Sequence, residues 1–350
     1  MTILVHNSPF SFKAVRLKIS IFMFAAASVG LFLCVPIKQQ VLEGQTMGTI
    51  YHVTLVNISR LQSRNLHKKI RVELKSINRI FSTYDTESEI SRFNRLPAHE
   101  WVKVSPFLYD LARFGKKWHS LTSGAWDGTV WPLYQLWGFT QNKPAIQIPS
   151  TDAVQSAMKQ VGYSFVNFGR EGFMMKTRKG VSIDLSSIAK GYAVDRVGAL
   201  LHGQDVSRFM VEIGGEVVVS GKNGANRFWR LGINIPDSNS GDQDTIHVIE
   251  MKGGAIATSG TYRRFYEVDG RKYAHVLDPR TGYPVQHDVV SVTITAPTCL
   301  EADAIATSVL VMGKEAGLSL IHQLDGIEGF LVIQDEVGEF EFIMSKGWVF

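Results

Sequence analysis

The spacing of apolar and polar residues along the chain predicts helices and strands in alternating groups. Leu66, Ile70 and Leu74 follow one another four positions apart, the spacing of one helix face, and predict a helix over residues 61–81. Similar patterns predict helices over 106–121, 188–201 and 301–312. Runs rich in β-branched and apolar residues predict strands over residues 50–56, 181–184, 209–213, 217–219, 229–233, 246–251, 289–295 and 329–333.

The grouping of these elements bears on the fold class. Strands that come in runs, with helices between the runs, favour an α+β domain with largely antiparallel sheets. Residues 41–350 contain no internal repeat and no linker rich in Pro, Gly or Ser. We therefore expect residues 41–350 to form one compact unit.

Residues 1–40 differ from the rest of the chain. Lys13, Arg16 and Lys18 precede an uncharged, mostly apolar run over residues 19–35, which is the order of a signal peptide or membrane anchor. The positive flank should stay cytoplasmic, so the rest of the chain is expected on the other side of the membrane. Cys34 resembles a lipid-attachment cysteine, and both a lipid anchor and an uncleaved helix remain open.

Composition narrows the classes of function. The chain has 350 residues, 45% hydrophobic and 20% charged, enough apolar content to bury a sizeable core. Residues 1–40 hold four of the 37 basic residues and none of the 32 acidic ones, so the remainder is nearly neutral. Binding to a nucleic-acid backbone needs a basic patch that this balance does not indicate. We therefore expect no nucleic-acid partner.

The helix predicted over 301–312 carries a candidate cation site. Asp303 and Thr307 lie four residues apart and therefore point the same way from a helix. A carboxylate and a hydroxyl among small residues form a half-site for a hard cation such as Mg²⁺. The alternative is that Asp303 caps the helix or accepts a hydrogen bond from a neighbouring backbone N–H.

A second candidate site surrounds the start of the helix predicted over 188–201. Asp184 ends the preceding strand, Ser187 lies where the helix begins, and Lys190 lies in its first turn. Free N–H groups at a helix N-terminus, together with a lysine, favour an anion. The alternative is a solvated lysine beside a serine N-cap.

Two further segments contain candidate chemistry. His275 precedes a tight-turn pattern over residues 278–282, and a histidine beside a phosphate site can act as a general base. The alternative is a hydrogen-bonded core histidine. The segment 123–129 precedes Trp131, Tyr134 and Trp137; such rings can enclose a flat heterocycle, or can simply form core. The common dinucleotide, hydrolase and zinc-protease motifs are absent from the sequence.

Taken together and in order, eight segments resemble the ApbE family of FAD:protein FMN transferases. They lie at residues 44–49, 81–94, 124–127, 181–195, 213–216, 258–262, 275–282 and 301–307. The resemblance implies an α+β, T-fold-like molecule that holds FAD in a cleft between two halves, with the pyrophosphate beside Mg²⁺.

The resemblance also implies roles for individual residues. The residues implied to bind FAD are Met47, Tyr84, Ala125, Trp126, Asp127, Asp184, Lys190 and Leu277. The implied magnesium ligands are the Ser187 backbone carbonyl, the Asp303 carboxylate and the Thr307 hydroxyl. Lys190 and magnesium would stabilise charge on the pyrophosphate, and His275 is our candidate for the base that activates the acceptor hydroxyl.

The implied reaction is magnesium-dependent transfer of FMN from FAD to a Thr or Ser hydroxyl of a target flavoprotein. It forms a phosphoester bond and releases AMP. Two alternatives remain open at this point: an FAD pyrophosphatase that produces FMN and AMP, and a non-catalytic exported flavin-binding protein. The family implies an acceptor with an S/T-G-A-S/T-type motif, in a membrane redox subunit such as that of Na⁺-translocating NADH:quinone reductase. The expected location is the periplasmic face of the inner membrane, where the N-terminal segment would anchor the chain.

Overall fold

The computed structural model describes residues 39–140, 147–236, 245–262, 264–335 and 337–348. The predicted signal or anchor over residues 1–40 lies outside these ranges except for its last two residues. Within the described ranges, no helix combines the length and the apolar character needed to cross a membrane.

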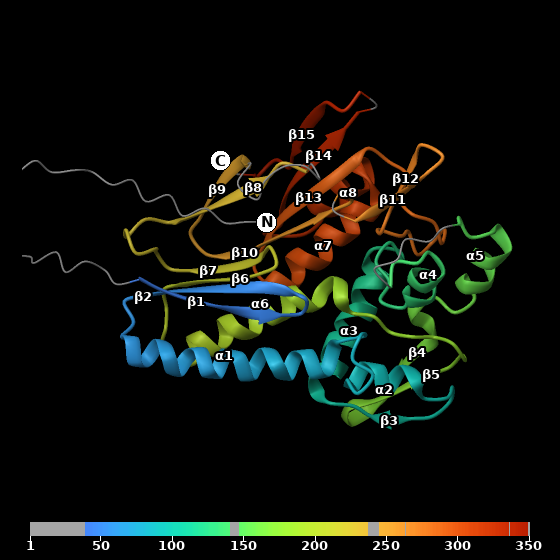
Figure 1. Ribbon diagram of the computed structural model, residues 1–350, viewed down its shortest axis with the longest axis horizontal. Helices are drawn as coiled ribbons and strands as arrows, with labels where there is room; N and C mark the ends of the chain where they lie inside the picture. The colour runs from blue at the N-terminus through green and yellow to red at the C-terminus, as the bar shows by residue number, and fades with distance from the viewer. Residues whose placement is uncertain (1–38, 141–146, 237–244, 263, 336, 349–350) are drawn as a thin grey trace, which may run out of the picture.

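An eight-stranded sheet runs through the centre of the molecule (Figure 1). Every neighbouring pair of its strands is antiparallel, as the sequence predicts. In sheet order, the strands are β1 (Gln39–Thr46), β2 (Thr49–Val56), β6 (Phe209–Ile213), β7 (Glu216–Ser220), β10 (Gly254–Gly260), β13 (Val289–Ala296), β14 (Glu328–Gln334) and β15 (Phe340–Met344).

The two faces of this sheet are covered differently (Figure 1). Helices cover one face: α1 (Arg60–Phe81), α6 (Ser186–His202), α7 (Cys299–Met312) and α8 (Lys314–His322). Their apolar sides share the largest core cluster with the sheet, including Ile70, Val197 and Ile305. The hairpin of β8 (Trp229–Asn234) and β9 (Thr245–Met251) covers the other face and forms a second core cluster with it.

The remaining elements lie at one end of the sheet, to the right in Figure 1. The helices there are α2 (Glu89–Arg95), α3 (Pro106–Leu121), α4 (Trp131–Leu136) and α5 (Thr151–Met158), with the 3-10 turns η1 (Tyr163–Phe165) and η2 (Arg170–Gly172). The strands are β3 (Val102–Lys103), β5 (Phe173–Lys176) and β4 (Val166–Phe168) in one small sheet, and the hairpin β11 (Phe265–Val268) and β12 (Arg271–Ala274). A third core cluster, which includes Trp137, Tyr266 and Leu277, joins α4 and α5 to this hairpin.

Most of the predicted elements are confirmed. α3 has the predicted bounds, α1 begins one residue early, and α6 and α7 each begin two residues early. The predicted strand over 181–184 is wrong. Its backbone is not paired with another strand there, because the Asn94 side chain binds both the N–H and the C=O of Ile183, at 2.7 and 2.8 Å. An amide side chain thus takes the place of a strand partner.

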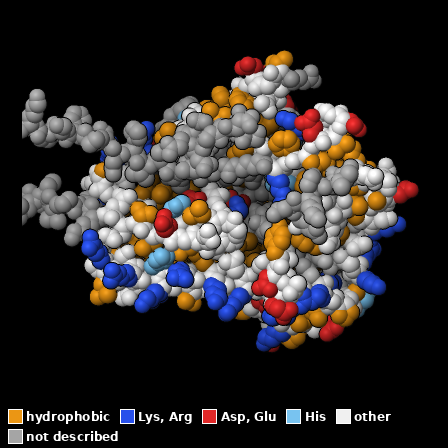
Figure 2. Space-filling view, in the orientation of Figure 1, with side chains coloured by type: hydrophobic (Ala, Val, Ile, Leu, Met, Phe, Trp, Pro, Cys, Tyr) orange, Lys and Arg blue, Asp and Glu red, His pale blue; other side chains and the backbone are white. Residues whose placement is uncertain are grey.

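The near-neutral charge of the chain after its leader predicted no basic patch, and this is wrong. α1 carries seven exposed Lys and Arg side chains, six of them along one arc of its solvent-facing side, and Figure 2 shows a row of such side chains there. A neutral sum does not exclude a local concentration of one sign, because helix periodicity sorts residues by face.

Candidate active site

A cavity of about 370 Å³ lies where the helical layer meets α4 and the β11–β12 hairpin. It brings together eleven of the twelve residues predicted from the sequence: Tyr84, Ala125, Trp126, Asp127, Asp184, Ser187, Lys190, His275, Leu277, Asp303 and Thr307. Met47 is the exception. It lies in the β1–β2 turn with φ 50°, packs half-buried against the main core, and is not among the lining residues. Its contact with FAD stays a prediction.

The position of Asp303 depends on a close approach of α6 and α7. A Cβ atom at Gly191 would lie 2.4 Å from the Cys299 carbonyl oxygen, so only glycine permits this approach. Asp195 of α6 accepts hydrogen bonds from the first two backbone N–H groups of α7, both at 2.8 Å. The Gly191 N–H in turn donates to Asp303 Oδ2 at 3.0 Å. Tight helix packing therefore fixes the Asp303 carboxylate at the cavity wall.

This geometry decides between the two alternatives for Asp303. The helix cap is wrong, because Thr298 is the N-cap of α7 and its side chain accepts from the Glu301 N–H. The bond to a neighbouring backbone amide is present, at Gly191. It occupies one carboxylate oxygen, and a carboxylate has further acceptor positions for a cation.

Lys190 forms an ion pair that the sequence did not indicate. Its Nζ lies 2.5 Å from Oε1 of Glu216, which is 1% exposed. Burial lowers the pKa of Lys190, but the Glu216 and Asp303 carboxylates outweigh burial and raise it above its ordinary value. The alternative of a merely solvated lysine is therefore wrong.

Two buried carboxyl groups, Glu216 and Asp303, lie around the single ammonium group of Lys190. Burial raises the pKa of Asp303 to about 8 and also raises the pKa of Glu216, although Lys190 opposes both shifts. Within the described part of the chain, Glu216 Oε2 is buried without a hydrogen-bond partner. Two desolvated carboxylates thus share one ammonium group, an arrangement that an additional cation would stabilise.

The start of α6 differs from the serine-capped helix that we considered. The N-cap is Leu185, and no side chain caps the helix. Asp184 instead accepts from the Ser186 N–H at 2.8 Å, and Ser187 lies within the first turn. The serine N-cap alternative is therefore wrong, and the first turn of α6 faces the cavity through Ser186, Ser187 and Lys190.

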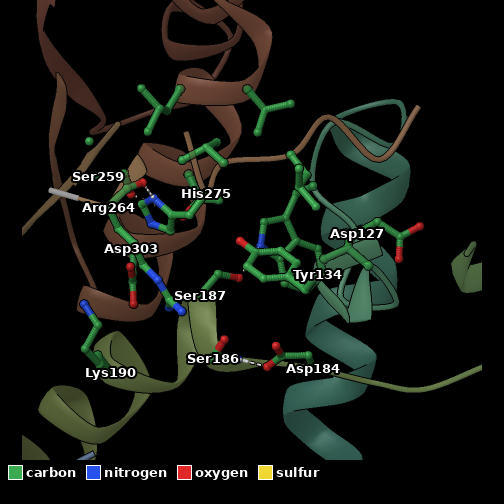
Figure 3. A pocket seen from close by; sticks show the side chains of 18 of the residues that line it. Asp127, Tyr134, Asp184, Ser186, Ser187, Lys190, Ser259, Arg264, His275 and Asp303 are labelled. Carbon is green, nitrogen blue, oxygen red and sulfur yellow. Dashed lines mark hydrogen bonds between the residues drawn. The ribbon is translucent and has the colours of Figure 1, made fainter. Parts of the chain in front are cut away.

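The aromatic segment contributes to the cavity wall and to the core. Trp126 is 2% exposed, stacks on Tyr163 and donates from Nε1 to Ser187 Oγ at 3.1 Å. Asp127 accepts from the N–H and hydroxyl of Thr129 and pairs with His119 at 3.1 Å. Figure 3 shows its carboxylate directed away from Asp303 and Lys190. Asp127 therefore shapes the wall through its backbone segment rather than by offering its charge.

His275 lies directly after β12, at the strand end where the sequence placed it. Its Nδ1 lies 3.0 Å from the Arg264 carbonyl oxygen; a carbonyl only accepts, so Nδ1 carries the proton and Nε2 is left as an acceptor. Burial lowers the pKa of His275 to about 4 despite this hydrogen bond, and the charges of Arg264 and Lys190 act in the same direction. His275 is therefore neutral at neutral pH. Its side chain is hydrogen-bonded, as expected of a core histidine, and it also lines the cavity.

The three residues expected to hold magnesium line this one cavity, and Figure 3 shows Ser187 between Asp303 and Tyr134. Thr307 Oγ1 lies 3.2 Å from Ser259 Oγ. Within the described ranges, no three His, Cys, Asp or Glu side chains cluster as a metal site, and only Asp303 of the expected set is of those types. An all-oxygen set of carbonyl, carboxylate and hydroxyl, beside two buried carboxyl groups that share one ammonium group, fits Mg²⁺.

Sequence reasoning missed several residues that line the cavity. Glu216 and Ser259 lie in segments that resemble the family, but we gave them no role. Tyr134 was noted only as one of several aromatic rings. Arg264, whose guanidinium enters the cavity in Figure 3, had no signal in the sequence, because a single arginine beside a strand has no distinguishing pattern.

Comparisons with known proteins identify the family and the fold. The ApbE family model matches residues 47–331. An FAD:protein FMN transferase of Vibrio cholerae is 36% identical over 314 residues, which cover 89% of this chain and 92% of the relative. Another, of Escherichia coli K12, is 34% identical over 298 residues, 84% of each chain.

Solved structures give the same result. The flavin transferase ApbE from Vibrio cholerae superposes with a TM-score of 0.80 and 34% identity, covering 89% of this chain and 98% of that one. The apo form of the Pseudomonas stutzeri flavinyl transferase ApbE superposes with a TM-score of 0.80 and 32% identity, covering 89% and 95%.

Proposed function

This chain belongs to the ApbE family and is an FAD:protein FMN transferase, and from that premise we propose the details of its reaction. FMN moves from FAD to a Thr or Ser hydroxyl of a flavoprotein, with Mg²⁺ as cofactor and AMP as the second product. The observation that supports this best is the convergence of Asp303, the Lys190–Glu216 pair and neutral His275 on one cavity.

The residues of the cavity suit each part of this step. The acceptor hydroxyl oxygen forms a bond to the FMN phosphorus and gives its proton to His275 Nε2. The bond from that phosphorus to the bridging oxygen of the pyrophosphate breaks, and AMP leaves with the electron pair. Lys190 keeps N–H donors for the pyrophosphate beyond the one that meets Glu216, because an ammonium group has three.

Magnesium, which would be held by Ser187, Asp303 and Thr307, supplies neutralisation of phosphate charge. Trp126 fixes one of these residues in place, since its ring nitrogen holds the Ser187 side chain. Tyr84 is 70% exposed at the cavity rim and meets Trp131 edge to face. We propose that the rings of Tyr84 and Trp131 contact the flat parts of FAD.

The test is a transfer assay on the full chain with FAD, MgCl₂ and a peptide bearing an S/T-G-A-S/T motif. Transfer predicts a peptide mass gain equal to FMN, and no gain for a peptide with alanine in place of the acceptor residue. FMN and AMP without peptide modification would instead identify a pyrophosphatase, and unchanged FAD would identify a flavin carrier.

A pair of variants tests the magnesium assignment. Asp303→Asn keeps the shape of the side chain but removes its charge, and should abolish magnesium-dependent turnover. Glu301→Gln is the matched control, because Glu301 is a carboxylate of the same helix that does not line the cavity. Equal activity of both variants would contradict the assignment.

We further propose that residues 1–40 hold the chain at the periplasmic face of the inner membrane. The apolar run over 19–35 and its positive flank support this. The acceptor would then be a membrane redox subunit, such as one of Na⁺-translocating NADH:quinone reductase. Digestion by external protease in spheroplasts, but not in intact cells, is the expected result; protection in both would contradict the location.

A further inference from the structure

α1 carries a stripe of positive charge that the transfer reaction does not use. Its members, called here the basic stripe, are Arg60, Arg64, Lys68, Arg71, Lys75 and Arg79, and all are exposed. At the angular step of an α-helix they fall within an arc of roughly 100°. Figure 2 shows Lys and Arg side chains in a row along the lower left edge of the molecule, where Figure 1 places α1.

Nothing in the described part of the chain neutralises the basic stripe. Glu73 is the single acidic residue of α1, and it pairs at 2.7 Å with Arg196 of α6. Within the described ranges, no member of the stripe takes part in an ion pair. The positive charge is therefore free to meet an external partner.

The stripe also opposes formation of its own helix. Four of its pairs lie four residues apart: 60 with 64, 64 with 68, 71 with 75, and 75 with 79. Like charges at this spacing repel one another and destabilise a helix. The arrangement therefore has no explanation in the stability of α1, and an anionic surface outside the protein would remove the repulsion.

The surroundings of the stripe favour a lipid bilayer as that surface. Leu61 and Val72, which are 71% and 70% exposed, border the stripe on one side, and a basic face edged by apolar side chains suits the interface of an anionic membrane. Phosphodiester headgroups supply the complementary charge. A nucleic acid would offer phosphates but no apolar layer for these two side chains.

The path of the chain places α1 near such a bilayer. The apolar run of the proposed anchor ends at residue 35, and β1 begins at Gln39. A four-residue segment spans at most about 14 Å. Gln39 pairs with Val56 of β2, only four residues before the first member of the stripe. The N-terminal end of α1 thus lies close to the point where the chain would leave the membrane.

We propose that the basic stripe binds the phosphate groups of anionic phospholipids and holds α1 flat against the bilayer. The proposal goes beyond FMN transfer and does not depend on it, and it rests on the anchor proposed above for the placement of α1 near the bilayer. A basic residue near an anionic membrane strengthens binding by about fivefold, which corresponds to about 1 kcal/mol, so six together make a strong, salt-sensitive contact.

The test is lysine acylation of the full chain, reconstituted into vesicles of phosphatidylcholine with or without phosphatidylglycerol and read by mass spectrometry. Acylation of Lys68 and Lys75 should fall about fivefold or more on the anionic vesicles, and high salt should restore it. Lys103 and Lys346, which are exposed elsewhere, should react equally on both. Equal acylation of the two α1 lysines on both vesicles would overturn the proposal.

Two matched variants separate the stripe from net charge. The stripe variant Arg60→Gln, Arg64→Gln, Arg71→Gln, Arg79→Gln keeps Lys68 and Lys75 as reporters and should lose their protection. The control variant Arg113→Gln, Arg170→Gln, Arg227→Gln, Arg230→Gln removes four exposed arginines elsewhere and should keep it. Protection that persists in the stripe variant would overturn the proposal. So would protection of the wild type by an added oligonucleotide but not by anionic vesicles.

Discussion

Replacing Gly191 by alanine tests whether the contact between α6 and α7 sets the position of Asp303. The new Cβ would lie 2.4 Å from the Cys299 carbonyl oxygen and 2.8 Å from Asp303 Cβ. Backbone atoms of α7 cannot turn away as a flexible side chain can. The two helices must therefore separate, and the hydrogen bond from the Gly191 N–H to Asp303 Oδ2 lengthens or breaks.

Three effects decide the size of the change. Overpacking of a tight core costs about 1–3 kcal/mol, and loss of a hydrogen bond to a buried carboxylate adds about 1.5 kcal/mol. Alanine in place of glycine within a helix stabilises the folded state by about 0.5–1 kcal/mol. The net expectation is a loss of about 1.5–4 kcal/mol in the free energy of unfolding, and each kcal/mol lowers the Tm by about 2–4 °C.

Activity should fall further than stability. A displacement of a catalytic group by about 1 Å costs on the order of 100-fold in rate, and lengthening a 2.4 Å contact to ordinary van der Waals distance requires a movement of that order. We expect the rate of FMN transfer at saturating magnesium to drop by about this factor at a temperature where the variant is still folded.

Urea unfolding followed by circular dichroism, together with the peptide transfer assay, measures both effects. Gly198→Ala is the matched control on the same helix, because its Cβ would meet only side chains, at 3.3 Å from Val218 Cγ1 and 3.7 Å from Phe209 Cε2. It should leave stability unchanged or slightly raised, and activity intact. If Gly191→Ala behaves like Gly198→Ala, the close approach of α6 and α7 does not position Asp303.

Three further predictions concern the site and its surroundings. Magnesium affinity should rise with pH, because burial raises the pKa of Asp303 to about 8 and the cation binds only the ionised carboxylate. Calorimetric titration should show proton release on magnesium binding at neutral pH, and this release should disappear well above pH 8. A heat of binding that does not change with pH would contradict this. With magnesium saturating, kcat/KM should fall on the acidic side near pH 4 rather than 6.5, because burial lowers the pKa of His275 and keeps it neutral as pH falls. His275→Gln should reduce kcat by about 100-fold or more and remove this acidic fall. A fall near pH 6.5 in the wild type would count against His275 as the base. Tyr163→Phe should leave the free energy of unfolding unchanged or raise it by about 1 kcal/mol, because within the described ranges the Tyr163 hydroxyl is buried without a hydrogen-bond partner; a clear loss in urea unfolding would show that the hydroxyl is satisfied.

Periodicity predicted the long helices well and missed several strands, among them β1 and β10. α1 and α3 have strong helical spacing and were predicted within one residue. β10 was missed, although it lies between β7 and β13 in the large sheet. Its sequence, GAIATSG, has few bulky β-formers. The composition of β10 therefore does not indicate that it belongs to the large sheet.

Some residues of the candidate site were likewise identified from the sequence, and others were not. Spacing placed Asp303 and Thr307 on the same side of a helix, and both line the cavity, since residues four apart on a helix point the same way whatever surrounds them. Glu216, which pairs with Lys190, was not assigned a role, because nothing near it in the sequence indicates that it is buried beside a lysine. The strand predicted over 181–184 failed for a related reason: its partner is a side chain, Asn94, from a distant part of the chain.

The sequence by itself determined the α+β class, the main helices and strands, and the family resemblance from which most of the cavity residues were named. Only the tertiary structure decided how close α6 and α7 approach, which carboxylate holds Lys190, which nitrogen of His275 is free, and where the cations of α1 point. The reason is physical. Local patterns depend on the fixed periods of helix and strand, so they can be read from neighbouring residues. Burial, charge pairing and pKa values depend on contacts between distant residues, which arise only when all the elements pack together.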